Sequence, residues 1–486
     1  MDALVFALGA WPTNLDPRYA PDAYSDRIAR LIYAPLLRRT PTGGVEPLLA
    51  ESVHRPDPLT VVVRVRSDAV FHDGAPITAN DVVATFDSIR APDSQSVKRL
   101  FLDVIETVTA EDARTVVFRL RSPHAPFLQV LAGIGIIPRS AIETGSADAL
   151  GSWTGSGPYL FDGASPGTEI RLRRSPLWRG PTAGIERLVF RSVPDATVRV
   201  LELIHGSVDM TWNDLPPHVV AWLETREGLT VQRRESTLVK YLAFNLDHEA
   251  LGDVRVRRAL ALAIDVESIV RFKLRGQATP ARSFMHPQSW AHASDLPAHR
   301  HAPQEARALL DAAGYPDPGG GLPRLKLTYK TSQDETAVAI AWVLRRQLAE
   351  VGVEMEVQSN EWGVFFSDIK QGRFDLYTLT GVGIDDPDWY SFVLHSKSLS
   401  PDGANRMRYV SSEMDDLLDR GRAEPDPDQR AAIYAQVQRL RARDMPLLPL
   451  WYQHNVGVSG SNVQGWSVPV DGDYSGLSLA TKASLR

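Results

Sequence analysis

Apolar and polar residues alternate along residues 324–380 in a pattern that predicts three strands separated by two helices. Residues 325–329 alternate between apolar and polar side chains, which is the two-residue period of a strand. Residues 353–357 and 374–378 repeat that alternation. The segments between them place apolar residues three and four apart, as on one face of a helix.

The first of these helices carries start and stop signals. Ser332 and Glu335 predict a capping box, in which each side chain satisfies an otherwise unpaired amide at the helix start. Gly352 predicts a left-handed cap at its end. A second helix is predicted over 362–371. The apolar residues at helical spacing in the first helix are Val338, Ala341, Trp342, Leu348 and Val351.

This order of strands and helices, with short connections, predicts a parallel, doubly wound sheet and therefore an α/β fold. Ligands bind such sheets beyond the carboxyl ends of the strands. Those ends fall at residues 330–333, 359–362 and 381–390, which include aromatic and acidic side chains. Part of a ligand pocket is therefore expected there.

Other regions show the same kinds of signal. Thr78 and Asp81 predict a second capping box, and Asp253 predicts the N-cap of a further helix. Apolar strands predicted at 60–65 and 115–120 indicate a mixed unit of strands and helices between about residues 37 and 151.

Composition narrows the class of protein. The 486 residues exceed one compact core, and 43% apolar with 23% charged residues is ordinary for a soluble globular protein. A formal charge of −6 argues against nucleic acid as the main partner. The absence of cysteine excludes disulfides, thiolate metal sites and thiol nucleophiles. No secretion signal is visible at Met1, which leaves a trimmed signal and a cytoplasmic location both open.

Several short segments, read in order, resemble the large family of oligopeptide-, dipeptide- and nickel-binding proteins of ABC importers. Each segment is weak alone, but together they follow the family order along essentially the whole chain. The segments are NLDP at 14–17, FHDGAPITANDV at 71–82, GSGPY at 155–159, GSVD at 206–209, YLAFN at 241–245, DVRVRRAL at 253–260 and AGYP at 313–316.

The resemblance implies a two-lobed, periplasmic-binding-protein-like fold of type II, in the large class with an inserted extra domain and a ligand cleft between the lobes. Two crossing segments would form a hinge, with Tyr241, Asn245, Tyr452 and Val456 as hinge residues. It also implies a monomer, periplasmic or anchored at the cell surface, whose partners are a small solute and the permease subunits. The implied boundaries are 1–36, 152–241 and 454–486 for lobe I, 37–151 for its insertion, and 242–453 for lobe II.

Candidate solute-binding residues follow from the strand-end loops and from the resemblance. They are predicted to line the cleft with aromatic faces, which suit the capture of apolar or sugar-like groups. For each aromatic residue the alternative is packing in a core. The predicted residues are Trp11, Thr13, Trp212, Asn213, Trp362, Gly383, Asp385, Asp386, Trp389 and Tyr390.

One feature of the peptide-binding relatives is missing. They bind the peptide's amino group with an aspartate shortly before an acidic-Pro pair. Alignment on Asp386 places Gly383 there, or Ile384 after a shift of one, and Asp385 could substitute only in a rearranged loop. An unpaired ammonium in a dry site is costly. This departure argues against an ordinary peptide ligand. A peptide-like solute stays the main hypothesis, with oligosaccharide, opine-like and metal-chelate solutes as alternatives.

Four histidines, at positions 286, 292, 299 and 301, could in principle hold a metal. The stretch is rich in Pro and Ala and has no carboxylate at regular ligand spacing, so solvated loop histidines are expected, with no metal and no cofactor.

Enzyme signatures are lacking. The sequence has no Gly-Lys phosphate loop, and no serine flanked by glycines at the spacing of a nucleophile elbow. A hydrolase with paired carboxylates stays an alternative from another class. A ligand sensor or chaperone without transport is a third, because its pocket would look alike. The favoured hypothesis is a binding protein that is not an enzyme.

Overall fold

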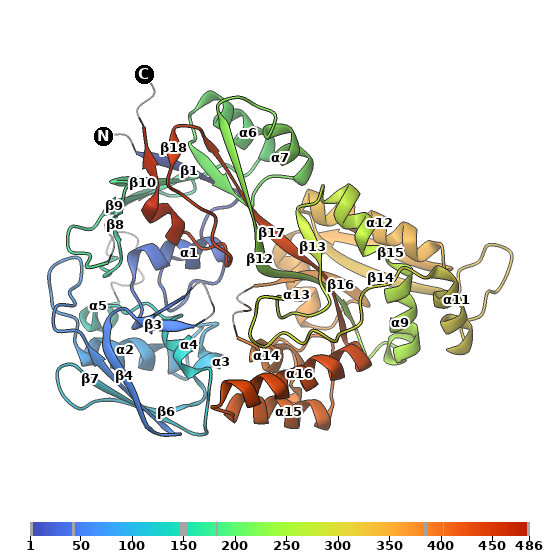
Figure 1. The fold of residues 1–486 in the computed structure, drawn as a ribbon, viewed down its shortest axis with the longest axis horizontal. Helices are drawn as coiled ribbons and strands as arrows, with labels where there is room; N and C mark the ends of the chain where they lie inside the picture. The colour runs from blue at the N-terminus through green and yellow to red at the C-terminus, as the bar shows by residue number, and fades with distance from the viewer. Residues whose placement is uncertain are drawn as a thin grey trace. The chain divides into compact units, whose positions relative to one another are not determined.

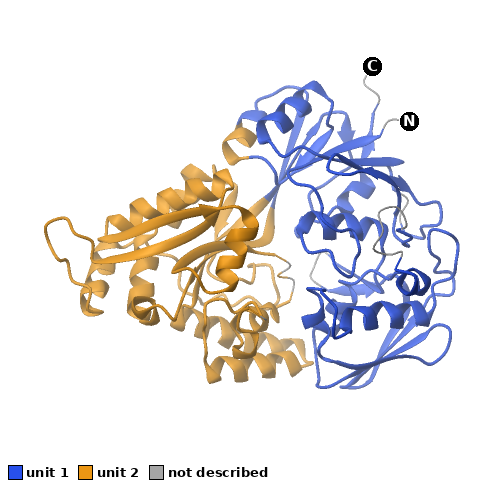
Figure 2. Cartoon of the chain, turned by 180° about the vertical axis from the view of Figure 1, so that it is seen from behind, with its two compact units in different colours: residues 1–215, 222–234, 455–486 blue, residues 216–221, 235–454 orange. Residues whose placement is uncertain are grey.

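The computed structural model describes residues 3–40, 44–145, 153–180, 183–382, 384, 386–401 and 403–483. The chain divides into two compact units, shown separately coloured in Figure 2: unit 1 comprises residues 1–215, 222–234 and 455–486, and unit 2 comprises 216–221 and 235–454. The chain enters unit 2 within β12 (Leu229–Phe244) and leaves it within β17 (Leu447–Gly460), and the short helix α7 (Pro217–Leu223) carries an additional crossing. In the described part of the chain, no helix combines the length and apolar character needed to span a membrane.

The main sheet of unit 1 is built around β1 (Leu4–Leu8). Strands β10 (Arg187–Ser192) and β11 (Met210–Trp212) pair with it in parallel, one on each side. Because β1 lies in the interior of the sheet, its sequence is a continuous apolar run that is almost entirely buried. Further elements of this layer are β8 (Tyr159–Ser165), β9 (Glu169–Arg174), α1 (Ala23–Ile32), α6 (Ala196–His205), β18 (Val463–Gln464), η4 (Ser475–Leu479) and β19 (Thr481–Lys482).

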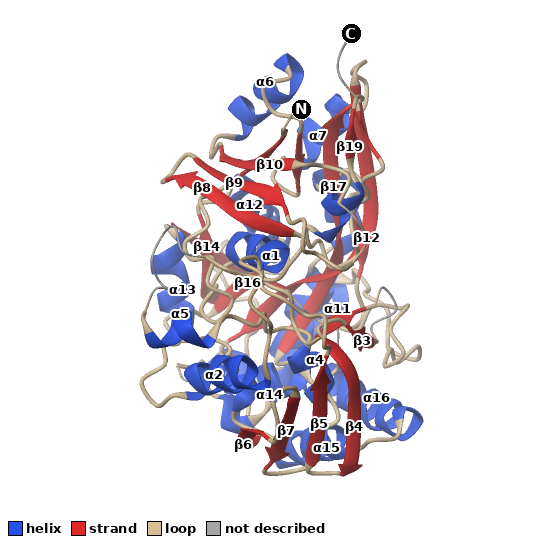
Figure 3. Cartoon of the chain, turned by 90° about the vertical axis from the view of Figure 1, so that its left-hand side faces the viewer, coloured by secondary structure: helices blue, strands red, loops and turns tan. Residues whose placement is uncertain are grey.

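Unit 1 also contains a second sheet with its own core. The order is β4-β5-β7-β6 and every pair is antiparallel, with helix α2 beside the strands (Figure 3). The predicted capping box is confirmed, because Asp81 accepts a hydrogen bond of 2.8 Å from the amide of Thr78. The elements are β2 (Leu37–Arg39), β3 (Val45–Pro47), β4 (Ala50–Asp57), β5 (Thr60–Val65), α2 (Ala79–Arg90), α3 (Arg99–Leu102), β6 (Ile105–Ala110), β7 (Thr115–Leu120), α4 (Phe127–Leu131) and α5 (Arg139–Glu143).

The sheet of unit 2 confirms the predicted parallel, doubly wound arrangement (Figure 1). Strand β14 (Leu325–Ser332) lies between β15 (Val353–Asn360) and β16 (Leu376–Gly381) and is parallel to both. Strand β12 then pairs antiparallel with β16, and β17 follows it. Connecting the parallel strands are the helices α12 (Glu335–Ala349) and α13 (Trp362–Lys370).

Side chains alternate between two cores along β12. Leu242 and Phe244 point into one core, which α9, α11 and α12 cover, whereas Tyr241 and Ala243 point into the other, which α13 to α16 cover. The sheet is therefore buried on both faces, as expected of this fold class. The remaining elements of unit 2 are α8 (Glu249–Gly252), α9 (Val254–Ala263), α10 (Val266–Ser268), the π-helix η2 (Ile269–Lys273), β13 (Ala278–Pro280), α11 (Pro303–Ala312), α14 (Trp389–Leu394), η3 (Ser396–Ser398), α15 (Ser412–Ala423) and α16 (Pro427–Asp444).

Two local predictions in unit 2 were wrong. The N-cap of α12 is Asp334, which accepts a hydrogen bond of 2.8 Å from Ala337, because β14 continues through Ser332 and so keeps that residue extended. Trp342 is 50% exposed on α12 and does not belong to its buried face. The predicted left-handed conformation of Gly352 is confirmed by its φ of +83°, but this glycine lies two positions beyond Glu350, the C-cap of α12.

Candidate functional site

The carboxyl edge of the parallel strands in unit 2 carries an aromatic cluster. Trp362 is the first residue of α13 and is 55% exposed, and its ring stacks on Phe366 with 5.7 Å between centroids and 17° between planes. The helix start is stabilised by Glu361, which accepts hydrogen bonds from the next two amides. Local capping therefore fixes a largely exposed indole at the strand-end edge.

A guanidinium group extends this cluster. Arg406 stacks over Phe366 at 5.0 Å and is half-buried. Burial raises the pKa of the phenols of Tyr241 and Tyr377, and the positive charge of Arg406 acts in the opposite direction on both. Arg406 thus lies between an exposed aromatic pair and two buried phenols.

The predicted residues Trp389 and Tyr390 join the same aromatic network. Trp389 is half-buried and stacks on Phe284 at 4.6 Å, and Phe284 in turn contacts Tyr241 at 5.5 Å. Tyr390 is fully buried, with its hydroxyl 3.1 Å from that of Ser283. The structure therefore brings Trp362 and Trp389 into one network around Arg406, while Tyr390 lies in the core beneath it.

Two acidic residues of the strand-end loop are already paired. Asp386 accepts two hydrogen bonds from Arg430, at 2.5 and 2.8 Å. Asp388 pairs with Arg422 at 2.9 Å. Burial lowers the pKa of Arg430, but its bonds to Asp386 outweigh that effect and raise it. The predicted residues Gly383 and Asp385 lie outside the described residues.

Two predicted residues of unit 1 remain accessible. Trp11 is half-buried and packs against the core of the main sheet. Thr13 is exposed, and its hydroxyl donates to Asp22, the N-cap of α1, at 2.7 Å. Both therefore present part of their surface to solvent.

The other two are internal. Trp212 is 1% exposed and packs against Tyr474, Phe6 and Trp466. Asn213 adopts a left-handed φ of 61°, and its side chain accepts from the amide of Val456 at 2.8 Å. Since positive φ is costly outside glycine, this residue is held by those bonds to β17. Their contact with a solute stays a prediction.

The predicted hinge residues lie in or beside the two crossing strands. Tyr241 and Asn245 belong to unit 2, where Asn245 donates to the carbonyl of Phe374 at 2.8 Å. Tyr452 also belongs to unit 2 and donates to the carbonyl of Met285 at 2.8 Å, whereas Val456 belongs to unit 1. Their role as a hinge stays a prediction.

The histidine stretch is less solvated than predicted. Only His301 is exposed, whereas His286 is 7% exposed. His292 and His299 are half-buried and bond to the carbonyls of Met285 and Ala281. In the described ranges, no group of three or more His, Asp or Glu side chains could hold a metal ion.

Comparison with known families decides the class of this protein. The family described as bacterial extracellular solute-binding proteins, family 5 Middle, matches residues 44–402, which is most of the chain. The chain belongs to this solute-binding family. Its function is that of the solute-binding component of an ABC importer, in a family of binding proteins rather than enzymes.

Two relatives and one solved structure illustrate the similarity of this solute-binding protein to others. Di/tripeptide-binding protein 2 of Pseudomonas aeruginosa is 28% identical over 492 residues, covering 94% of this chain and 91% of the relative. Glutathione-binding protein GsiB of Salmonella typhimurium is 26% identical over 483 residues, covering 96% and 93%. The structure of the oligopeptide-binding protein AppA of Bacillus subtilis with a nonapeptide has a TM-score of 0.87 at 25% identity and covers 99% of both chains. The predicted two-lobed fold class is thus confirmed.

Sequence reasoning missed Arg406 in this solute-binding protein. It lies in an irregular segment beyond the strand-end loop, and no periodicity or motif distinguishes it among the arginines of the chain. Its stacking on Phe366 and its nearness to Tyr241 arise only in the folded unit.

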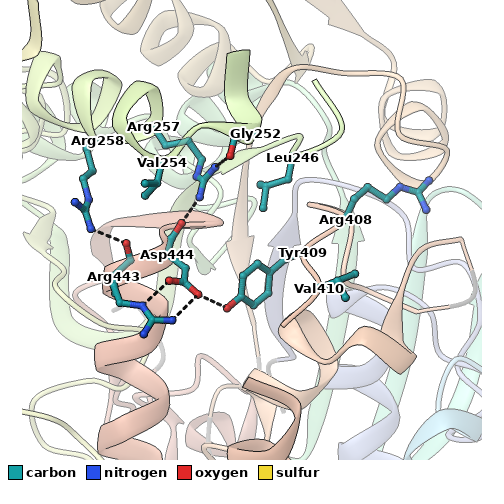
Figure 4. A pocket seen from close by; sticks show the side chains of 10 residues that line it. All are labelled: Leu246, Gly252, Val254, Arg257, Arg258, Arg408, Tyr409, Val410, Arg443 and Asp444. Atoms are coloured by element: carbon teal, nitrogen blue, oxygen red, sulfur yellow. Dashed lines mark hydrogen bonds and ion pairs between the residues drawn. The ribbon is translucent and has the colours of Figure 1, made fainter. Parts of the chain in front are cut away.

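A cavity of about 510 Å³ in unit 2 is a structural feature rather than a solute site (Figure 4). Arg257 donates there to the carbonyls of Leu251 and Met445, at 2.6 and 2.9 Å, and Asp444 accepts from Tyr409 at 2.7 Å. Arg257 and Arg258 also donate to the carbonyls of Asp444 and Arg443, the last two residues of α16, so both arginines cap the C-terminus of that helix. None of the predicted site residues lines this cavity.

Proposed function

We propose that this solute-binding protein captures a peptide-like solute and delivers it to the permease of its importer. The observation that carries the proposal is the aromatic surface at the carboxyl edge of the unit 2 sheet, where Trp362 is 55% exposed and Trp389 half-buried. Such faces grip apolar side chains and release ordered water. Relatives that match nearly the full chain are named for di- and tripeptides and for glutathione, itself a peptide.

The amino end of the solute is proposed to contribute little to binding. Asp386 and Asp388 are both neutralised by arginines of their own unit, so neither is available to an ammonium group. An acetylated peptide is therefore expected to bind with an affinity within about threefold of the free peptide, since no buried charge pair is lost. Isothermal titration of both forms checks this, and strict dependence on a free amino group would contradict it.

The remaining features of the proposal concern the whole protein. A monomer that acts outside the cytoplasm, without catalysis and without nucleic acid, accords with the family and with the formal charge of −6. The predicted lobe boundaries and the role of the four predicted hinge residues in closing around the solute are part of the same proposal.

A ligand screen by thermal shift tests this function. Pools of random tripeptides, oligosaccharides and metal chelates are added separately to the protein. The peptide pool is expected to raise the melting temperature, because a solute at a hundred times its Kd adds about 2.7 kcal/mol to the free energy of unfolding. A shift with another pool alone, or turnover of any pool, would contradict the proposal.

A further inference from the structure

The guanidinium of Arg406 has no acidic partner among the residues that the structure describes. Its Nε is buried and has no hydrogen-bond acceptor. None of the described carboxylates forms an ion pair with the guanidinium. The side chain donates hydrogen bonds to the phenols of Tyr241 and Tyr377, and the residue as a whole is half-buried. A half-buried cation whose bonds go to neutral phenols still lacks a counter-charge.

The surroundings of Arg406 hold this charge in place. Phe366 lies beneath the guanidinium at 5.0 Å, and Trp362 continues the aromatic surface outward. The phenols of Tyr241 and Tyr377 are 4% and 0% exposed, so the inner side excludes water. Stacking favours a planar cation and holds the guanidinium in one orientation, with the two phenols accepting part of its hydrogen bonds.

The charge balance of the neighbourhood favours an anion. Asp386 and Asp388, from the adjacent strand-end loop, are both paired to arginines. Arg406 alone among these groups lacks a counter-charge. A carboxylate matches a guanidinium edge with two parallel hydrogen bonds, and such charge-assisted pairs are the strongest hydrogen bonds in proteins.

We infer that Arg406 binds a carboxylate of the solute, while Trp362 and Phe366 contact the apolar group next to it. The inference rests on the proposed function and narrows it: the solute is a peptide-like acid, held by its acidic end rather than its amino end. Arg406 is thereby a specificity-determining residue, because a buried cation left unpaired penalises a neutral solute.

Matched peptide pools test the inference. Random tripeptides are prepared as free acids and as carboxyl-terminal amides, and the Kd of each pool is measured by competition. The wild type is expected to bind the acids roughly tenfold or more tightly than the amides. Arg406→Met is expected to bind both pools equally, and Arg406→Lys to restore part of the preference for acids.

Arg345→Met is the matched control. Arg345 lies over Trp342 at 5.0 Å on the outer helix α12, so it is an arginine–tryptophan pair of the same unit. This variant is expected to keep the full preference for acids. Equal affinity of the wild type for both pools, or an unchanged preference in folded Arg406→Met, would overturn the inference.

The same experiment separates this inference from the proposed function. If neither peptide pool binds, the peptide proposal fails, and non-peptide carboxylic acids are then compared with their neutral amides. A preference for those acids that Arg406→Met abolishes supports the carboxylate site without peptides. If Arg406→Met changes the binding of none of the acids, the carboxylate site is refuted.

Discussion

Two arginines at the same edge of unit 2, Arg430 and Arg406, differ in their ion-pair partners. Arg430 is 6% exposed, donates to both oxygens of Asp386 and bonds to the carbonyl of Gly421. Arg406 stacks on Phe366 just as Arg430 stacks on Tyr434, but none of the described carboxylates pairs with it. Stacking on an aromatic ring is thus common to both, and only the counter-ion distinguishes them.

The difference indicates that arginines at this edge can serve either the stability of the fold or the binding of a solute. A buried ion pair must be complete, since loss of one partner strands the other in a poorly solvated place. An arginine that lacks a counter-charge at an exposed aromatic surface gains most from a ligand that supplies an anionic group. Arg430 therefore serves stability, and Arg406 is available for recognition.

The largest expected effect is on stability and concerns Arg430. Arg430→Ala leaves Asp386 without its partner and should lower the free energy of unfolding by about 3–5 kcal/mol. Denaturant titration measures the loss. Arg439→Ala serves as the control, because Arg439 and Asp295 form an exposed pair, and such pairs contribute only about 0–1 kcal/mol. Equal, small losses in both variants would remove the distinction between the two arginines.

Next in size is an effect on affinity at the aromatic surface. Trp362→Ala should raise the Kd for the bound peptide pool roughly tenfold or more, because exposed aromatic anchors dominate binding energies. Trp342→Ala is the control, since Trp342 is similarly exposed, at 50% against 55%, but lies on α12. Isothermal titration compares the two. Similar Kd changes in both variants would show that exposure alone, rather than the neighbourhood of Arg406, explains the effect.

Quenching of tryptophan fluorescence sharpens this comparison. Acrylamide should quench both indoles in the free protein, and bound peptide should protect Trp362 only. The difference in quenching between wild type and Trp362→Phe, measured with and without peptide, reports on that indole. Protection that persists unchanged in Trp362→Phe would place the contact elsewhere.

The smallest expected effect concerns the exposed pair on α12. Arg345→Met should lower the free energy of unfolding by about 0.5–1 kcal/mol at most, the usual size of an exposed cation–π contact. The Kd for peptide should stay the same. A shift of Kd larger than that of Arg406→Met would reverse the assignment of the two surfaces.

The class and much of the framework of this protein could be predicted from its sequence. Strand alternation predicted β14 and β15, and the pair Thr78 and Asp81 predicted the start of α2, because these signals depend on near neighbours in the chain. Motifs in family order predicted the solute-binding class. Helix α12 shows the limit, since its N-cap is Asp334 and its Trp342 faces outward.

Which charged groups and aromatic rings remain available to a solute depends on how the chain folds. Trp212 and Trp362 are equally plausible in sequence, yet one is 1% exposed and the other 55%. Asp386 is paired because Arg430 reaches it across 44 positions of the chain, whereas no carboxylate in the described ranges reaches Arg406. Pairing and burial depend on distances in space that no local pattern encodes. The strand-end edge could therefore be predicted from the sequence, but not which of its side chains are exposed and lack a partner.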